Sequence, residues 1–522
     1  MILPSLITVG LPKEEQTDAE AFADLKISEL LDPAVTAVMG RGTEKEDILA
    51  RQELFAELLE AELPESGLPE DKNGENETLQ TMQRLHSSSV RLSSLCNARQ
   101  KAESELEKNA LCLCCADVYV SIVTRGCELA GGSFFITRFR DAMKAESEKP
   151  AFLLLKKDIT AVVPALRSML EMKISYNGER QRDESVRRKL SLSLGAPDEE
   201  KDGGFYRELV LCAADLGLTL PEKGECALGP IPPYLAALTE SADPDGASEI
   251  AAFASRHRTE IPEEAAGLCT ETGFYLSVAA LCGRIREAGI PLCFPKLCDE
   301  PVMEVREAYD VTLLAKGETN IVPNDIRLDS ADPFFYLTGA NGGGKTTYLR
   351  AVGTAAVFAA SGCPLPAAEA KLRPVQRVLT HFPHDERFGL GGRFADEQAR
   401  IAVLTGRITS VPTPEGAGQD LVLLNETYST TGEQKAEAET SALATRIRAS
   451  GAFGIYVTHQ HGENGDGIPL LSVVIDSGDS NRRTYKVAPA VSGGGSYAKD
   501  ILSKYRLDRE GLKERKKEKS ER

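Results

Sequence analysis

The sequence predicts an α-helical region over about the first 300 residues and, after it, an α/β domain with a mostly parallel sheet. Three observations lead to this fold class. Apolar residues recur at helical spacing before residue 300, short β-prone runs alternate with helical stretches after it, and a glycine-rich loop joins one of these runs to an alanine-rich stretch. A chain of 522 residues is long enough for roughly two to four domains.

The helical region opens with a signal for a helix N-terminus. Thr43 to Glu46 has the form of a capping box, and apolar residues then recur at helical spacing. A further helical pattern covers residues 77–116. We therefore expect a helical body over residues 26–300, preceded by an N-terminal extension of residues 1–25.

Residues 339–346 form a complete phosphate-binding motif, which fits G-x-x-x-x-G-K-[ST] at each constrained position. The preceding run, 334–338, is apolar and β-prone, and residues 345–360 are rich in alanine with no internal proline. In a strand–loop–helix context the backbone N–H groups of the loop and the helix N-terminus face an anion. A glycine-rich turn that binds nothing is the alternative, and the flanking elements disfavour it.

The residues of this loop have distinct expected roles. Lys345 is expected to reach the β- and γ-phosphates, and the Thr346 hydroxyl is expected to be a ligand of Mg²⁺. The expected ligand is therefore a nucleoside triphosphate with Mg²⁺. The predicted nucleotide-binding residues are Gly339, Asn341, Gly342, Gly343, Gly344, Lys345, Thr346 and Thr347.

A second nucleotide element follows the apolar run 421–424, which has the character of a central parallel strand and ends in Asn425 and Glu426. We predict that Glu426 polarises the attacking water and that Asn425 contacts the metal where an Asp is expected. A missing unit charge about 4 Å from the ion changes the interaction energy by about 1 kcal/mol in water and about 4 kcal/mol at an effective dielectric constant of about 20. Hydrolysis is therefore expected to be slow or to demand more magnesium. The alternative is that these two residues merely end a buried strand.

A third element is the β-prone run 453–457, which is followed by Thr458 and His459. An imidazole at this point can lie near the γ-phosphate and report the nucleotide state, although a lone histidine is more often structural. The order and spacing of the three elements favour the functional interpretation. Two later runs, 471–475 and 484–487, are predicted to be further strands of a largely parallel sheet.

These blocks resemble the ATPase domain of the MutS mismatch-repair family. The resemblance covers about residues 300–507 and rests on five segments in the family's order: 322–326, 337–350, 421–431, 457–461 and 493–498. It implies an ABC-type P-loop NTPase domain that binds ATP and Mg²⁺ over residues 301–510, after a helical core and lever over 26–300. Residues 511–522 are then a basic, disordered tail.

The resemblance also implies a homodimer whose two ATP sites lie at the shared interface. Candidates for contacts to the partner's nucleotide are found in two segments, which contain Gly392 and Arg393, and Ser429, Thr430 and Thr431. Arg393 stands where the family pattern suggests a small hydroxyl residue. A guanidinium there can clamp phosphate, or it can be an ordinary surface arginine.

MutS proteins read mismatches through a Phe-x-Glu wedge in a domain ahead of the helical core. Here the core-like segment begins near residue 26, which leaves no room for that domain, and Phe55-Ala-Glu57 lies inside a helical pattern. Two functions remain open. The chain is either a DNA-handling ATPase that clamps duplex or branched DNA, with a repair protein as a further partner, or a nucleotide-gated ATPase that binds protein or ribonucleoprotein. We favour DNA.

Composition limits the remaining possibilities. A formal net charge of −18 argues against a protein whose whole surface is basic and binds nucleic acid, although a local basic surface suffices for phosphate contacts. Without an apolar run of 18 residues or a basic N-terminal leader, no membrane partner is expected and the protein is predicted to be cytoplasmic.

The cluster Cys112, Cys114 and Cys115 is expected to hold reduced thiols, not zinc. A basic segment is predicted to be a solvated helix face: Arg180, Arg182, Arg187, Arg188 and Lys189.

Overall fold

The chain folds into two compact units that are each discontinuous in sequence. One contains Met1–Ile7 and Asn73–Leu276, and the other contains Thr8–Lys72 and Ser277–Arg522. These bounds differ from the predicted boundaries at residues 25/26 and 300/301, because residues 8–72 group with the C-terminal part. The computed structural model describes residues 3–10, 17, 19–60, 76–170, 172–180, 186–194, 233–259, 261–262, 264–383, 393–409, 419–428, 433–458, 467–475 and 483–490.

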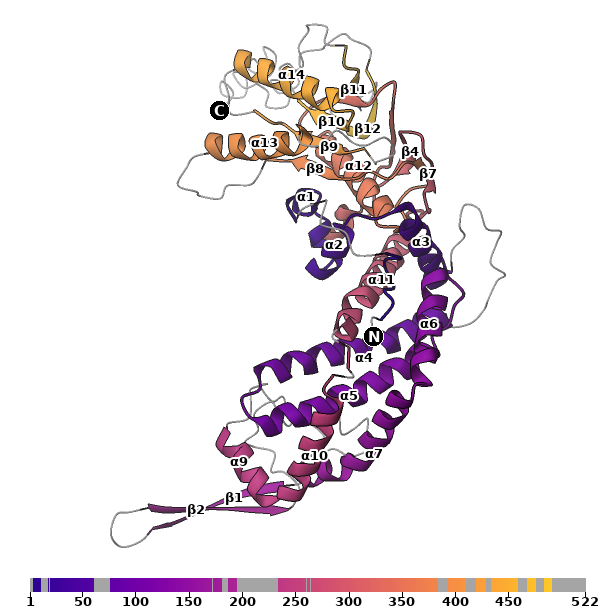
Figure 1. Cartoon of the computed structure of the whole chain (residues 1–522). Helices are drawn as coiled ribbons and strands as arrows, with labels where there is room; N and C mark the ends of the chain where they lie inside the picture. The colour runs from indigo at the N-terminus through magenta and orange to yellow at the C-terminus, as the bar shows by residue number, and fades with distance from the viewer. Residues whose placement is uncertain are drawn as a thin grey trace, which may run out of the picture. The chain divides into compact units, whose positions relative to one another are not determined.

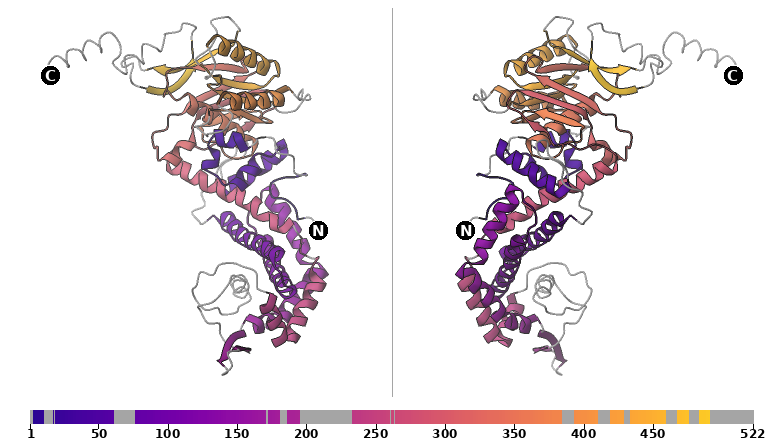
Figure 2. Two further views of the ribbon diagram at one scale, coloured as in Figure 1. Left: turned by 90° about the vertical axis from the view of Figure 1, so that its left-hand side faces the viewer. Right: turned by 90° about the vertical axis from the view of Figure 1, so that its right-hand side faces the viewer.

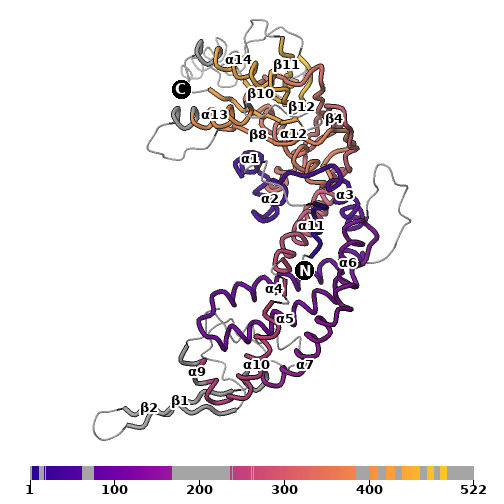
Figure 3. Tube along the Cα trace, viewed as in Figure 1, coloured from indigo at the N-terminus to yellow at the C-terminus, as the bar shows by residue number. Residues whose placement is uncertain are grey.

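The first unit is predominantly helical, and α4 runs side by side with α5 (Figures 1 and 3). The helical pattern predicted over 77–116 corresponds to two helices, because Ser104 caps the second one by accepting a hydrogen bond from the Glu107 N–H at 3.2 Å. The helices of this unit are α4 (Glu77–Lys101), α5 (Glu105–Cys127), α6 (Phe134–Ser147), α7 (Pro150–Leu170), α9 (Pro233–Ala242), α10 (Pro244–His257) and the first half of α11 (Glu264–Glu287).

The basic segment near residue 180 forms a hairpin, so the predicted helix face is wrong. Strands β1 (Met172–Arg180) and β2 (Val186–Leu194) pair antiparallel, with Arg187 opposite Glu179 and Lys189 opposite Asn177. The reason is the period of the apolar residues, which alternate along both strands as a β-ribbon requires. Arg182 lies outside the described residues.

The second unit is built on a sheet with the strand order β12-β11-β6-β10-β9-β8. Figure 2 shows the orange and yellow strands of this unit from two opposite sides. Neighbours from β11 to β8 are parallel, and β12 is the antiparallel edge strand. The predicted largely parallel sheet is therefore present. Its strands are β6 (Phe334–Thr338), β8 (Val378–His381), β9 (Leu421–Asn425), β10 (Phe453–Val457), β11 (Leu470–Ile475) and β12 (Arg483–Pro489).

Helices cover both faces of this sheet. Buried residues of α13 (Arg393–Thr409) and α14 (Glu433–Ala449) form one core with Val422 and Leu424 of β9. Helix α12 (Lys345–Ala360) packs on the other face, where Leu423 points toward Gly353. Because β9 and β10 are buried along their whole length, the sequence there is a run of apolar residues.

A second, smaller sheet and the N-terminal helices complete the unit. The small sheet has the order β3-β7-β4-β5. Its strands are β3 (Lys296–Leu297), β4 (Val302–Ala308), β5 (Asn324–Asp329) and β7 (Glu369–Leu372). The short helices are α1 (Ala19–Asp24), η1 (Ile27–Glu29), α2 (Pro33–Met39), α3 (Lys45–Leu59) and η2 (Val311–Lys316).

The predicted capping box is displaced by one residue. Glu44 is the N-cap of α3, and its N–H donates to Oδ2 of Asp47 at 3.4 Å. The hydroxyl of Thr43 instead donates to the carbonyl oxygen of Ala360 at 2.6 Å. The long-range bond fixes the start of α3 beside the end of α12.

Two of the described helices, α5 and α11, are long and apolar enough to cross a membrane by length and composition. In α5 67% of the apolar window is buried inside the protein, and in α11 44% is buried. A packed core helix has the same composition, so this is weak evidence for a span. The expected absence of a membrane partner stays a prediction.

A glycine in β10 tests how tightly the central strands pack. A Cβ at Gly454 would lie 2.6 Å from the Phe334 ring and 2.9 Å from the carbonyl oxygen of Val422. We expect Gly454→Ala to lower the free energy of unfolding of β9 and β10 by about 1–3 kcal/mol, measured by native-state hydrogen exchange. Gly406→Ala on α13 is the matched control. Its methyl meets open space, and Ala favours a helix by up to about 1 kcal/mol. Equal protection in the Gly454 variant and the parent would contradict the prediction.

Candidate nucleotide-binding site

The candidate site lies at the carboxyl edge of the parallel strands. The glycine loop follows β6, Glu426 follows β9, and Thr458 follows β10. Since these three strands are parallel neighbours, their carboxyl ends share one edge of the sheet. The fold thus gathers segments that are far apart in the sequence.

The glycine loop has a backbone that L-residues rarely adopt. Gly339 has φ 142° and Gly344 has φ 97°. A Cβ at Gly339 would also lie 2.9 Å from Cβ of Val473 on the neighbouring strand β11. Gly344 is the N-cap of α12, so the loop leads directly into the helix N-terminus and its free N–H groups.

Lys345 is held inside the loop. Its side chain is 5% exposed, and Nζ donates to the carbonyl oxygen of Gly339 at 2.8 Å and to Oδ1 of Asn341 at 3.3 Å. Burial lowers the pKa of Lys345, the carboxylate of Glu426 at 3.9 Å acts in the opposite direction, and the guanidinium of Arg483 adds to the lowering. A buried cation held by neutral carbonyl groups is well suited to receive an anion.

Thr346 and Asn425 meet across the edge of the sheet. Nδ2 of Asn425 lies 3.3 Å from Oγ1 of Thr346, and Oδ1 of Asn425 is buried without a hydrogen-bond partner. A carbonyl oxygen and a hydroxyl are ligands that Mg²⁺ accepts. The two residues therefore fit a magnesium ion, with a weaker, uncharged amide in place of a carboxylate.

Glu426 marks a sharp change of direction after β9. Its φ is 51°, and its N–H donates to the carbonyl oxygen of Val457 at 2.8 Å, which ties the ends of β9 and β10 together. The side chain is 37% exposed, in contrast to the buried strand before it. The next residue, Thr427, accepts or donates a hydrogen bond with Nδ1 of His381 at 3.2 Å. This arrangement places a water-accessible carboxylate 3.9 Å from the Lys345 ammonium.

Several predicted site residues are not part of the contacts described above. Thr347 lies half-buried in the first turn of α12, and Arg393 is the first residue of α13. The remaining ones lie outside the described residues: Gly392, Ser429, Thr430, Thr431 and His459.

The structure adds a residue to which the sequence gave no role. Tyr485 on β12 is 48% exposed, and a Cβ at Gly344 would lie 3.4 Å from its Cδ1. The Asn324 side chain fixes this strand, since Nδ2 donates to the Tyr485 carbonyl oxygen at 3.0 Å and Oδ1 accepts from the Val487 N–H at 2.8 Å. An exposed aromatic ring beside a phosphate loop is a platform on which a base can stack. An aromatic residue on a polar edge strand is the signal that could have indicated it.

Comparison with known proteins identifies the domain. The family model described as MutS domain V matches residues 335–462. The DNA mismatch repair protein MutS 2 of Halobacterium salinarum is 34% identical over 152 residues, or 28% of this chain and 17% of that protein. Over this stretch the chain is similar to proteins of the MutS family.

Two further MutS relatives match a longer stretch. The DNA mismatch repair protein MutS of Carboxydothermus hydrogenoformans is 27% identical over 37% of this chain and 23% of its own length. That of Granulibacter bethesdensis is 29% identical over 43% of this chain and 24% of its own length. The matches thus span about a quarter or less of these MutS proteins. ATPase activity with ATP and Mg²⁺ is a property of the MutS family, so these matches support an ATPase at the level of the family.

The cysteine cluster predicted to hold reduced thiols lies in the described part of the chain. Cys112, Cys114 and Cys115 are all buried in α5, and burial raises the pKa of the Cys112 thiol. Within the part of the chain that the structure describes, no group of three or more His, Cys, Asp or Glu side chains is arranged to hold a metal ion.

Proposed function

We propose that this chain is a cytoplasmic ATPase of the MutS type, which works as a homodimer and uses ATP to switch a helical clamp between open and closed states on DNA. The observation that carries the proposal is the buried Lys345 in the glycine loop, facing Glu426 and close to the Thr346–Asn425 pair at the same sheet edge. The MutS domain V match over residues 335–462 supports it.

The residues of the loop bind the phosphates. Backbone N–H groups of the loop and of the N-terminus of α12 point at the anion, and Lys345 exchanges its bonds to Gly339 and Asn341 for phosphate oxygens. Thr346 and Asn425 would hold a magnesium ion, which would neutralise phosphate charge when bound. Tyr485 supplies a face for the base.

Glu426 orients the attacking water. Its carboxylate is partly exposed, so water can reach it, and the hydrogen bond of its N–H to Val457 fixes the backbone that carries it. The carboxylate, which can accept a hydrogen bond from water, lies 3.9 Å from the Lys345 ammonium. In the proposed dimer, segments of the partner around residues 392–393 and 429–431 complete the site.

The DNA part of the proposal competes with a nucleotide-gated protein- or ribonucleoprotein-binding function. The net charge of −18 favours the competitor. The MutS assignment and the hairpin β1–β2, whose sequence carries Arg180, Arg187, Arg188 and Lys189, favour DNA.

Two substitutions separate ATP binding from turnover. We expect Lys345→Ala to abolish tight ATP binding by calorimetry, because the buried cation facing the phosphates is lost. Glu426→Gln should keep binding but reduce hydrolysis by about 100-fold or more, and so trap the ATP-bound dimer in sedimentation experiments. Normal ATP affinity in the lysine variant, or a monomer with and without ATP in the glutamine variant, would count against the shared-site mechanism.

Restoring the missing charge should ease the metal requirement. Asn425→Asp adds a carboxylate beside Thr346, worth up to about 4 kcal/mol of attraction for the ion at an effective dielectric constant of about 20. We expect a lower half-saturating magnesium concentration and faster turnover, measured as ATPase rate against magnesium concentration. Asp299→Asn at an exposed ion pair is a control for a remote charge change. An unchanged magnesium dependence in Asn425→Asp would show that position 425 does not contact the metal.

DNA binding is tested by filter binding to duplex, mismatched and junction DNA, at low and moderate salt and with and without ATP. A clamp should bind with a steep salt dependence, about −0.9 in log–log slope for each phosphate neutralised, and the affinity should change with ATP. Lys345→Ala should remove the effect of ATP but not the salt slope. The absence of DNA binding at low salt would contradict the DNA function and favour the protein-binding alternative.

A further inference from the structure

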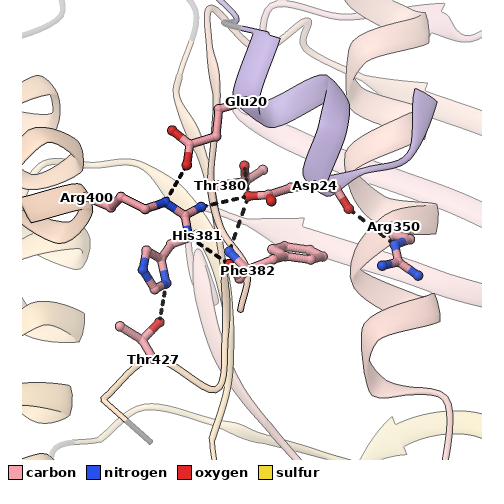
Figure 4. Close-up of polar contacts among 8 residues, drawn as sticks. All are labelled: Glu20, Asp24, Arg350, Thr380, His381, Phe382, Arg400 and Thr427. Atoms are coloured by element: carbon pink, nitrogen blue, oxygen red, sulfur yellow. Dashed lines mark hydrogen bonds and ion pairs between the residues drawn. The ribbon is translucent and has the colours of Figure 1, made fainter. Parts of the chain in front are cut away.

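Helix α1 belongs to the same compact unit as the nucleotide site, although it precedes the glycine loop by more than 300 residues. Its last residue, Asp24, is 7% exposed. Oδ2 of Asp24 accepts a hydrogen bond from the Thr380 hydroxyl at 2.8 Å and another from the N–H of Phe382 at 3.2 Å (Figure 4). The carboxylate therefore holds the carboxyl end of β8 from one side.

Arg400 of α13 closes this arrangement. Its Nη1 donates to the carbonyl oxygen of Phe382 at 2.9 Å, its Nη2 lies 3.6 Å from Oδ2 of Asp24, and its Nε pairs with Glu20. Asp24 and Arg400 thus hold both backbone polar groups of Phe382 and attract each other (Figure 4). Charged partners make such hydrogen bonds stronger than neutral ones.

The main chain of the same residue reaches the phosphate-loop helix. The carbonyl oxygen of Asp24 accepts a hydrogen bond from Nε of Arg350 at 3.2 Å, and Arg350 lies on α12. The next residue, Leu25, packs into the notch at Gly353, where a Cβ would lie 2.3 Å from Leu25 Cδ2 and 3.0 Å from Leu423 Cδ1. The end of α1 is therefore packed against both α12 and β9.

The other branch leads to the residue that orients water. His381, at the end of β8, bonds through Nδ1 to the hydroxyl of Thr427 at 3.2 Å, and both side chains are buried. Thr427 directly follows Glu426. Hence Asp24 contacts one strand that supports the Glu426 segment and one helix that carries Lys345 and Thr346.

From these contacts we infer that Asp24 is a positioning residue of the ATPase reaction, which sets the distance between the phosphate-binding and water-orienting halves of the site. This inference rests on the proposed function. The two halves come from different elements, so a common support must fix their mutual placement. A displacement of about 1 Å by a change remote from the chemistry can cost about 100-fold in rate.

The test compares Asp24→Asn and Asp24→Ala with the control Asp299→Asn, which removes a carboxylate from an exposed ion pair in the same unit. Asn keeps an oxygen for Thr380 and Phe382 but loses the charge opposite Arg400, whereas Ala loses both. We expect kcat for ATP hydrolysis to fall about 10-fold in the Asn variant and about 100-fold in the Ala variant, with the calorimetric Kd for ATP within about threefold of the parent. The control should retain its kcat and Kd.

A merely structural role gives a different pattern. If binding and turnover fall together, in proportion to the fraction unfolded at the assay temperature, Asp24 only stabilises the fold and the inference is overturned. An unchanged kcat in both Asp24 variants overturns it as well.

Hydrogen exchange without nucleotide separates this inference from the proposed function. Asp24→Asn should speed exchange of the Phe382 amide and of amides around Arg400 and Arg350, relative to Asp299→Asn. If the parent neither binds nor hydrolyses ATP, the proposed function fails, and the exchange pattern still shows whether Asp24 holds the two elements together. Unchanged exchange at all three places excludes the positioning role.

Discussion

The burial of the central strands is the constraint on which the second unit depends. Every residue of β9 and β10 is buried, so neither strand can carry a charged side chain along its length. The charged Glu426 stands just after a strand ends, and parallel pairing brings the strand ends to one edge. The glycine loop, Asn425, Glu426 and Thr458 are therefore neighbours as a consequence of the packing, and the phosphate-loop helix must begin at that same edge.

The positive charge of Lys345 has few negatively charged neighbours at this edge of the sheet. Lys345 is 5% exposed and its ammonium is held mainly by carbonyl groups, with the partly exposed Glu426 at 3.9 Å. An Asp at position 425 would add a second carboxylate next to Thr346, but the sequence has an amide. The amide at position 425 acts in opposite directions on the two parts of the ligand. Compared with an Asp, it leaves the site more attractive to a polyphosphate and less attractive to a divalent cation.

The correct predictions are strongest for one local unit, whereas the errors have both local and long-range causes. The β6–loop–α12 unit follows from glycine spacing and from one apolar run, both of which act within about 25 residues. The β1–β2 hairpin differs from the predicted helix face because its apolar residues recur with a period of two. A cluster of basic residues alone does not distinguish a helix face from a β-ribbon. The box at Glu44 was misplaced because Thr43 is engaged by Ala360, 317 residues away. Tyr485 gained a role only once β12 paired with β11 beside the loop.

The contacts of residues 20–25 show why the unit with the candidate nucleotide site needs a segment from near the start of the sequence. The family match begins at residue 335, but the packing of this unit also uses Leu25. Because Gly353 on α12 has no side chain, it leaves a notch, and Leu25 packs into that notch. Without that segment, the Thr380 hydroxyl, the Phe382 N–H and the Arg400 guanidinium would lose an anionic partner at buried or half-buried positions. The segment thus makes contacts across more than 300 residues, whereas the β6–loop–α12 unit is formed by residues that are close in sequence. In the proposed mechanism, these long-range contacts support the placement of the glycine loop relative to Glu426.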